Sequence, residues 1–259
     1  MASGDALLRC EEDIVWSSEF QVVRRSFEKQ SVRILASVNR FEDQYLLAHR
    51  SKRIGSISDL AGKKIGVARK SIFEFYLSRF FSLNGMDLKA FTIIDVQFPR
   101  AAEQFINGNM DSVVAWTPYA SEISTKLGDE VVSWSIQSSQ PGYGVIVARK
   151  DWVPSKPDVI KRFLRSLAQA EDYLVKNPDA SKSIVQKRLN LDGAAIDHLW
   201  SEVRFFLSLD QSLVLAMEDQ ARWMISKRLT ATKKLPNFVD YIYEDGLHAV
   251  KPEAVNIIR

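Results

Sequence analysis

Cysteine is nearly absent from the sequence, with Cys10 the only one among 259 residues. A single thiol forms neither an internal disulfide nor a cysteine-based metal site, and a catalytic cysteine needs a histidine partner. The three histidines, His49, His198 and His248, lie far apart with no motif around them. We therefore expect no metal, no cofactor and no catalytic cysteine, and we expect Cys10 to be a small buried hydrophobic residue.

Long hydrophobic runs and a strong charge of one sign are also missing. No apolar run approaches the roughly 18 residues of a membrane span. The opening MASGDALLRCEEDIVW lacks a basic start followed by an apolar block, so the sequence predicts no signal peptide in this chain. The 35 basic and 32 acidic residues give a net charge of +3, too mild to indicate nucleic-acid binding. The densest basic stretches, including KRLTATKK at 227–234, are interpreted as solvated surface.

Catalytic signatures are absent as well. The sequence has no HExxH, no nucleophile elbow, no CxxC and no glycine-rich loop with phosphate-binding spacing. Glu19 and Glu74 are conceivable as an acid pair, but nothing in the sequence places them together. We expect a protein that is not an enzyme.

What is present between residues 62 and 136 is a regular alternation of short apolar runs and amphipathic stretches. Such alternation predicts right-handed crossovers and a mainly parallel α/β sheet. The expected strands are 62–68, 91–96, 112–116 and 130–136, and the expected helices are 71–85, 100–108 and 118–128.

The flanking segments continue the pattern and then become helical. Strands are expected at 13–17, 32–38, 44–50 and 143–149, with a helix at 19–29. The C-terminal part carries apolar stripes at helical spacing, which predict core-facing helices at 156–178, 178–190, 193–207 and 209–229.

Two stretches rich in Ser, Gly and Pro, 50–62 and 137–144, flank the central block. A chain that leaves one body, builds a second and returns needs two such crossings, which predicts two lobes joined by a hinge. We place lobe I at 1–52 and 143–259, lobe II at 53–142, and the hinge near 50–56 and 138–144.

Candidate ligand contacts follow from the strand ends, because open parallel sheets bind ligands beyond the carboxyl ends of their strands. Ser18 and Ser71 precede expected helices, where free N–H groups favour an anion, and Arg69 is a cation placed to pair with it. Aromatic residues could form the wall of a pocket. The candidate residues are Ser17, Ser18, Arg69, Ser71, Phe98, Trp116, Thr117 and Tyr143.

Four stretches carry a family resemblance: SGDALLRCEEDIVWSSEF, SISDLAGKKIGVARKS, AAEQFINGNMDSVVAWTPYA and PGYGVIVARKDWVPSKPDVIKRFLRSLAQAEDYLVKNPDAS. They resemble the bacterial solute-binding proteins for nitrate, sulfonate and taurine, a group that also includes pyrimidine-precursor binders. The resemblance implies a two-lobed type II periplasmic-binding fold and an extracytoplasmic protein that captures a small anionic or polar organic solute between its lobes. It implies an ABC permease in the membrane as partner.

The sequence also departs from the pattern of that family. Lys70 and Thr117 stand where relatives commonly carry a small residue and an acid, so the ligand class is not carried over. Relatives begin with an export signal, a strand and a helix that this chain lacks, so lobe I is expected to be incomplete at its N-terminus, with dimerisation through its exposed sheet edge as one outcome.

Three alternatives stay open: a ligand-sensing module of a signalling system, a pyrimidine-synthesis type of enzyme, and a relative whose cleft no longer binds a solute.

Overall fold

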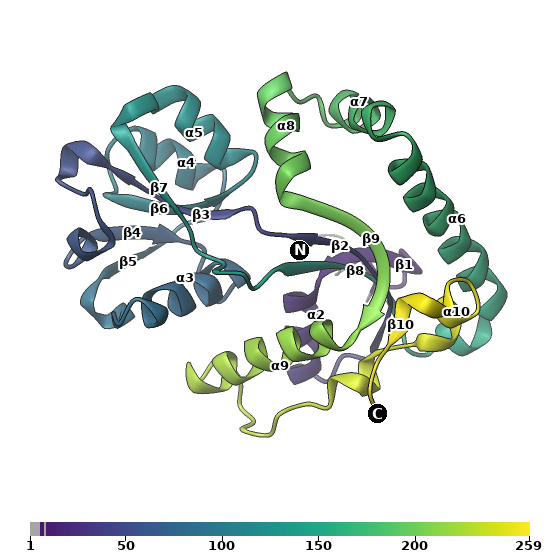
Figure 1. Cartoon of the computed structure of the whole chain (residues 1–259). Helices are drawn as coiled ribbons and strands as arrows, with labels where there is room; N and C mark the ends of the chain where they lie inside the picture. The colour runs from purple at the N-terminus through teal and green to yellow at the C-terminus, as the bar shows by residue number, and fades with distance from the viewer. Residues whose placement is uncertain (1–5, 8) are drawn as a thin grey trace. The chain divides into compact units, whose positions relative to one another are not determined.

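The structure is a computed structural model that describes residues 6, 7 and 9–259. Its contacts divide the chain into two compact units (Figure 1). Unit 1 contains Met1–Phe41, Pro141–Asn190 and Val203–Arg259, and unit 2 contains Glu42–Gln140 and Leu191–Glu202. Unit 2 thus begins before the expected boundary at residue 53, because the strand Gln44–His49 pairs within its sheet. None of the helices in the described part of the chain is long and apolar enough to cross a bilayer.

Unit 1 is built on a five-stranded sheet in the order β1-β8-β2-β9-β10. Its neighbours pair antiparallel except for β9 and β10, which are parallel. The chain leaves unit 1 along β2 and returns along β8 beside it, so these two central strands necessarily run in opposite directions. The strands are β1 (Ile14–Ser18), β2 (Val32–Phe41), β8 (Gly142–Arg149), β9 (Val203–Asp210) and β10 (Val255–Asn256).

Helices cover this sheet. α2 packs against α9 through buried apolar residues, with the Phe20 and Trp223 ring centroids 6.1 Å apart. α6 carries an apolar stripe whose Ile160 and Leu164 are fully buried, as its helical periodicity predicts. The helices are α2 (Glu19–Phe27), α6 (Pro157–Lys176), α7 (Pro178–Leu189), α9 (Gln211–Ser226) and α10 (Glu244–His248).

Unit 2 contains a second five-stranded sheet, in the order β5-β4-β6-β3-β7. β5, β4 and β6 are parallel, whereas β3 pairs antiparallel with both β6 and β7. The strands are β3 (Gln44–His49), β4 (Lys64–Val67), β5 (Thr92–Asp95), β6 (Ser112–Trp116) and β7 (Val131–Ser135). The helices are α3 (Ile72–Leu83), α4 (Arg100–Ile106), α5 (Tyr119–Leu127) and α8 (Gly193–Glu202).

The prediction of mainly parallel sheets is wrong. Only the β5-β4-β6 part of unit 2 and the short β9–β10 pair are parallel. The sequence alternation shows that helices separate the strands, but it does not show which strand pairs with which. β7 follows a helix yet lies beside β3, a strand from before the central block, and therefore pairs antiparallel.

The expected helix at 193–207 is also wrong in its second half. α8 ends at Glu202, and the VRFFLSLD run forms β9, which pairs with β2. Val203, Phe205 and Phe206 are residue types that favour strands, and the pairing with β2 decides the outcome. The assignment of Cys10 to the core is wrong too, because its side chain is exposed.

Candidate ligand-binding site

In unit 2, Arg69 and Ser71 follow β4 and precede α3. Ser71 is the N-cap of α3: its Oγ accepts a hydrogen bond from the Phe73 N–H at 3.1 Å and donates to the Ala68 carbonyl at 2.5 Å. The Arg69 side chain is 53% exposed, and its Nε lies 3.4 Å from the Glu74 carboxylate. The expected cation therefore lies beside the expected anion-binding helix start, but it is already paired with an acid.

Trp116, at the end of β6, packs among three other aromatic rings. It stacks on Phe73 with a centroid distance of 4.7 Å and meets Phe98 and Tyr119 edge-on at 4.6 and 4.9 Å. All four rings are partly exposed. Trp116 and Phe98 are thus held by neighbours within unit 2 while part of each ring still reaches solvent.

Thr117 is buried and hydrogen-bonded to an acid distant in sequence. Its Oγ1 donates to Glu202 Oε2 at 3.0 Å, and its backbone N–H donates to the Asp43 carbonyl at 3.3 Å. The Glu42 N–H donates to the Glu202 carbonyl at 3.1 Å. An acid from the last residue of α8 thus lies beside Thr117 at this strand end.

Burial perturbs the titration of this cluster. Desolvation raises the pKa of Asp43 to about 7, and desolvation together with the nearby Asp43 raises the pKa of Glu202 to about 8. Burial lowers the pKa of His198, whose Nε2 lies 3.2 Å from Glu202 Oε1. Burial therefore disfavours the charged form of both partners in this contact.

In unit 1, Ser17, Ser18 and Tyr143 lie together where β1 ends and β8 begins. Ser18 pairs with Gly144, the residue after Tyr143, in the β1–β8 ladder. Ser18 is the N-cap of α2, yet its side chain makes no capping hydrogen bond. The Ser17 hydroxyl donates to the Ser18 carbonyl at 3.3 Å. Tyr143 is buried, and burial is the main cause that raises the pKa of its phenol.

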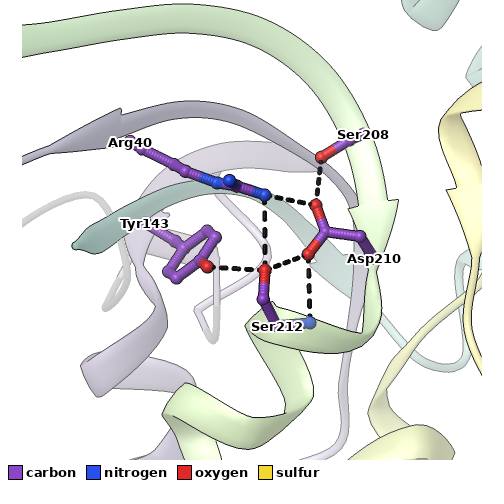
Figure 2. Close-up of polar contacts among 5 residues, drawn as sticks. All are labelled: Arg40, Tyr143, Ser208, Asp210 and Ser212. Atoms are coloured by element: carbon purple, nitrogen blue, oxygen red, sulfur yellow. Dashed lines mark hydrogen bonds and ion pairs between the residues drawn. The ribbon is translucent and has the colours of Figure 1, made fainter. Parts of the chain in front are cut away.

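Tyr143 also belongs to a polar network that the sequence did not indicate (Figure 2). Its hydroxyl lies 2.8 Å from Ser212 Oγ, and the Arg40 guanidinium lies over its ring at 5.2 Å. Arg40 Nη2 donates to Asp210 Oδ2 at 2.6 Å. Ser208 and Ser212 donate to the same carboxylate.

Asp210 is the acceptor that organises this network. Burial raises its pKa, but the hydrogen bond from Ser212 and the charge of Arg40 outweigh that effect, so the pKa lies below the ordinary value for aspartate. Arg40 Nε is buried with no hydrogen-bond partner among the described residues. The guanidinium thus has donor capacity left in a region where its charge is already balanced.

Glu19 lies directly behind Tyr143. Its carboxyl is fully buried, accepts from the Tyr143 N–H at 3.0 Å, and accepts from Gln220 Nε2 at 2.7 Å. Desolvation raises its pKa to about 7 against the lowering effect of those hydrogen bonds. Glu74 belongs to unit 2, where it accepts from the Lys70 N–H and pairs with Arg69. Each acid therefore has its own partners within its own unit.

These features define a class of protein: an α/β chain of two units, each built on a five-stranded mixed sheet, with polar and aromatic residues gathered at strand ends. Its fold is that of the type II periplasmic-binding proteins. The chain belongs to the NMT1/THI5 like family, whose model matches residues 7–181.

The chain also matches curated proteins over part of their length. The taurine-binding periplasmic protein of Escherichia coli is 28% identical over 131 residues, which cover 49% of this chain and 40% of the relative. The chain spans about half the length of the curated relatives it matches, or less.

Two solved structures share the fold at low sequence identity. The periplasmic aliphatic sulphonate binding protein SsuA from Escherichia coli has a TM-score of 0.76 and 15% identity, covering 92% of this chain and 78% of that one. The desulfurization enzyme DSZB has a TM-score of 0.68 and 13% identity, covering 93% and 85%. Both binding proteins and an enzyme are thus built on this fold, so the fold alone does not decide the function.

Proposed function

We propose that this protein is the solute-binding component of an ABC importer and captures a small anionic or polar organic solute. The observation that carries the proposal is the family match over residues 7–181. A relative named for taurine binding and a structural neighbour named for sulphonate binding support the same class of solute. An ABC permease is the proposed partner, and an extracytoplasmic location follows from that role.

The proposed contacts are two groups of residues, one on each unit. On unit 2 they are Arg69, Ser71, Phe98, Trp116 and Thr117, and on unit 1 they are Ser17, Ser18 and Tyr143, to which the structure leads us to add Arg40 and Ser212. The hydroxyls and the helix N-terminus at Ser71 would donate hydrogen bonds to an oxyanion. Trp116 and Phe98 would cover the apolar part of the solute.

The charge balance narrows the class of solute. Arg69 is paired with Glu74, and Arg40 with Asp210. A strongly charged anion would compete with those carboxylates for the guanidinium groups. We infer that the solute carries no more than one negative charge and takes much of its binding free energy from neutral donors and aromatic contact.

A thermal-stability screen tests the proposal. A solute that binds only the folded protein stabilises it by about 2.7 kcal/mol at a concentration 100 times its Kd. We expect at least one sulfonate, carboxylate, nitrate salt or pyrimidine to raise the Tm, and we expect Tyr143→Phe, which keeps the ring but removes the hydroxyl, to reduce that rise. If none of these solutes raises the Tm at millimolar concentration, the proposal is wrong.

A further inference from the structure

Four segments of unit 1 converge on a second pocket. No residue that we propose to contact the solute is part of its lining. The segments are the end of α2 with the turn after it (26–31), the start of β2, the residue after β8, and the chain from 232 to 241. The Lys150 N–H donates to the Ser31 carbonyl, and the Tyr243 N–H donates to the Ile34 carbonyl, both at 2.9 Å. Backbone hydrogen bonds therefore hold the surrounding segments in place.

This pocket, which we call the basic pocket, lies at the opposite end of β8 from Tyr143. Tyr143 is the second residue of β8, and Lys150 follows its last residue. The cavity volume is about 570 Å³, within the range of small-molecule sites. A separate ligand could therefore occupy it.

Its lining is strongly positive. Lys29, Arg33, Lys150 and Lys234 face one acid, Asp240, so the lining carries a net charge of +3, equal to that of the whole chain. Among the described residues, no hydrogen bond or ion pair engages the ammonium groups of the three lysines. A concave surface that holds like charges together raises the local concentration of counter-ions.

Arg33 is the most buried of these cations. It lies in β2, its Nη1 donates to the Val32 carbonyl at 3.2 Å, and the Asp240 charge acts on it. Burial lowers its pKa, and Asp240 opposes that change. Asp240 thus favours the charged form of Arg33, and one acid leaves most of the positive charge of the pocket unbalanced.

The pocket also has an apolar side and a set of neutral polar groups. Phe27, Leu235, Pro236 and Tyr241 contribute apolar surface, and Ser31, Thr232 and Asn237 contribute hydroxyl or amide groups. Inorganic phosphate would leave that apolar surface uncovered. An anion with an attached organic group would use both parts.

We propose that the basic pocket binds a small organic oxyanion with two negative charges, of the phosphomonoester class. A phosphomonoester has a charge of −1.5 to −2 at neutral pH and three acceptor oxygens, which suits several unpaired cations. The ammonium groups would bind the phosphate oxygens, and Tyr241 and Leu235 would contact the organic group. This site is separate from the proposed importer function and does not depend on it.

Phenyl phosphate is a suitable probe, with phenyl sulfate, phenol and inorganic phosphate as comparisons. Calorimetric titration of the full chain at low salt should give a Kd below about 1 mM for phenyl phosphate. Phenyl sulfate, with one charge, and inorganic phosphate, without the ring, should each bind at least several-fold more weakly. Phenol should not bind measurably.

The double substitution Lys150→Gln and Lys234→Gln should weaken phenyl phosphate binding by about tenfold or more. Lys176→Gln with Lys187→Gln is the matched control, since both lysines are exposed on unit 1 outside the pocket, and it should leave the Kd unchanged. Backbone amide shifts of Arg33 and Lys150 on titration locate the site even if a variant folds poorly. The proposal would be overturned if both double variants lost phenyl phosphate affinity equally, or if the amide shifts on titration occurred away from the pocket.

Discussion

Replacing Glu19 by glutamine should stabilise the protein above pH 7 and have much less effect near pH 5. Glu19 is fully buried, and desolvation raises its pKa from 4.5 to about 7. Between those two values the folded state keeps a proton that the unfolded state has lost. Stability therefore falls as pH rises through this window and stays lower above it.

The magnitude follows from the two pKa values. Each pKa unit corresponds to about 1.36 kcal/mol, so the carboxylate lowers the free energy of unfolding by about 3 kcal/mol at pH 8 relative to its value below pH 4.5. Glutamine cannot ionise and removes that loss. The difference in stability between the variant and the natural protein should therefore grow by about 3 kcal/mol from acid to alkaline pH.

The hydrogen bonds can be kept in the variant. The glutamine carbonyl can accept from the Tyr143 N–H, and its amide can donate to Gln220 Oε1, which is buried with no partner among the described residues. Gln220 must turn its amide group over for this, and one of its polar atoms then stays unpaired, as before. The backbone N–H groups of Glu19 and Phe20 also bond to this carboxyl, and losing such a bond would lower stability at every pH without changing the pH dependence.

Calorimetry at pH 5 to 8.5 measures the effect and can separate transitions of the two units. For a domain of this size 1 kcal/mol moves Tm by about 2–4 °C, so the variant should gain several degrees at pH 8.5 and little at pH 5. Glu253→Gln, an exposed acid in unit 1, is the control and should not alter the pH dependence. An unchanged pH profile in Glu19→Gln would refute the burial argument.

Three further outcomes are expected. Trp116→Ala should cost about 2 kcal/mol of stability, because the partly exposed ring loses its aromatic contacts. The same variant should bind the solute tenfold or more weakly in titrations. A loss of stability without a loss of binding would assign the ring to the core. Glu202→Gln should raise the Tm most above pH 8, since desolvation raises the pKa of that carboxyl and its charged form is disfavoured; a lower Tm at pH 9 would contradict this. Gly142→Ala should cost about 1–3 kcal/mol of stability in urea denaturation, because the added Cβ would lie 2.3 Å from the Phe41 ring. Gly193 has open space around it, so Gly193→Ala should change the stability by no more than about 0.5 kcal/mol.

Sequence reasoning was most successful where local pattern decides the structure. The expected strand at 112–116 has the observed bounds, and α3 begins after Ser71 as the serine cap predicts. β9 shows the opposite case. Its apolar residues continue the stripe of α8, and only pairing with β2 makes them a strand. Asp210, the N-cap of α9, is the local signal that could have marked the preceding run as a separate element.

In the candidate site, too, residues placed by local sequence pattern were predicted, and residues placed by long-range strand pairing were not. Ser18, Ser71 and Trp116 lie at the strand ends where their order in the sequence puts them. Arg40, Asp210 and Ser212 were missed, because 170 residues separate Arg40 from Asp210 and only the β2–β9 pairing brings them together. A sequence read along the chain contains no spacing rule for such a contact.

Thr117 shows why a local departure from a family pattern is weak evidence about a ligand. From the sequence, threonine in place of an acid indicates a site that has lost a charge. In the structure Glu202 lies 3.0 Å from the threonine hydroxyl, with Asp43 near enough to raise its pKa further. The acid is therefore present in space, but at neutral pH it holds its proton. Desolvation disfavours the negative charge of both acids in this corner of unit 2, and the same groups can still form hydrogen bonds with a solute. Repulsion of an oxyanion should therefore grow with pH, first as Asp43 ionises near pH 7 and then as Glu202 ionises near pH 8.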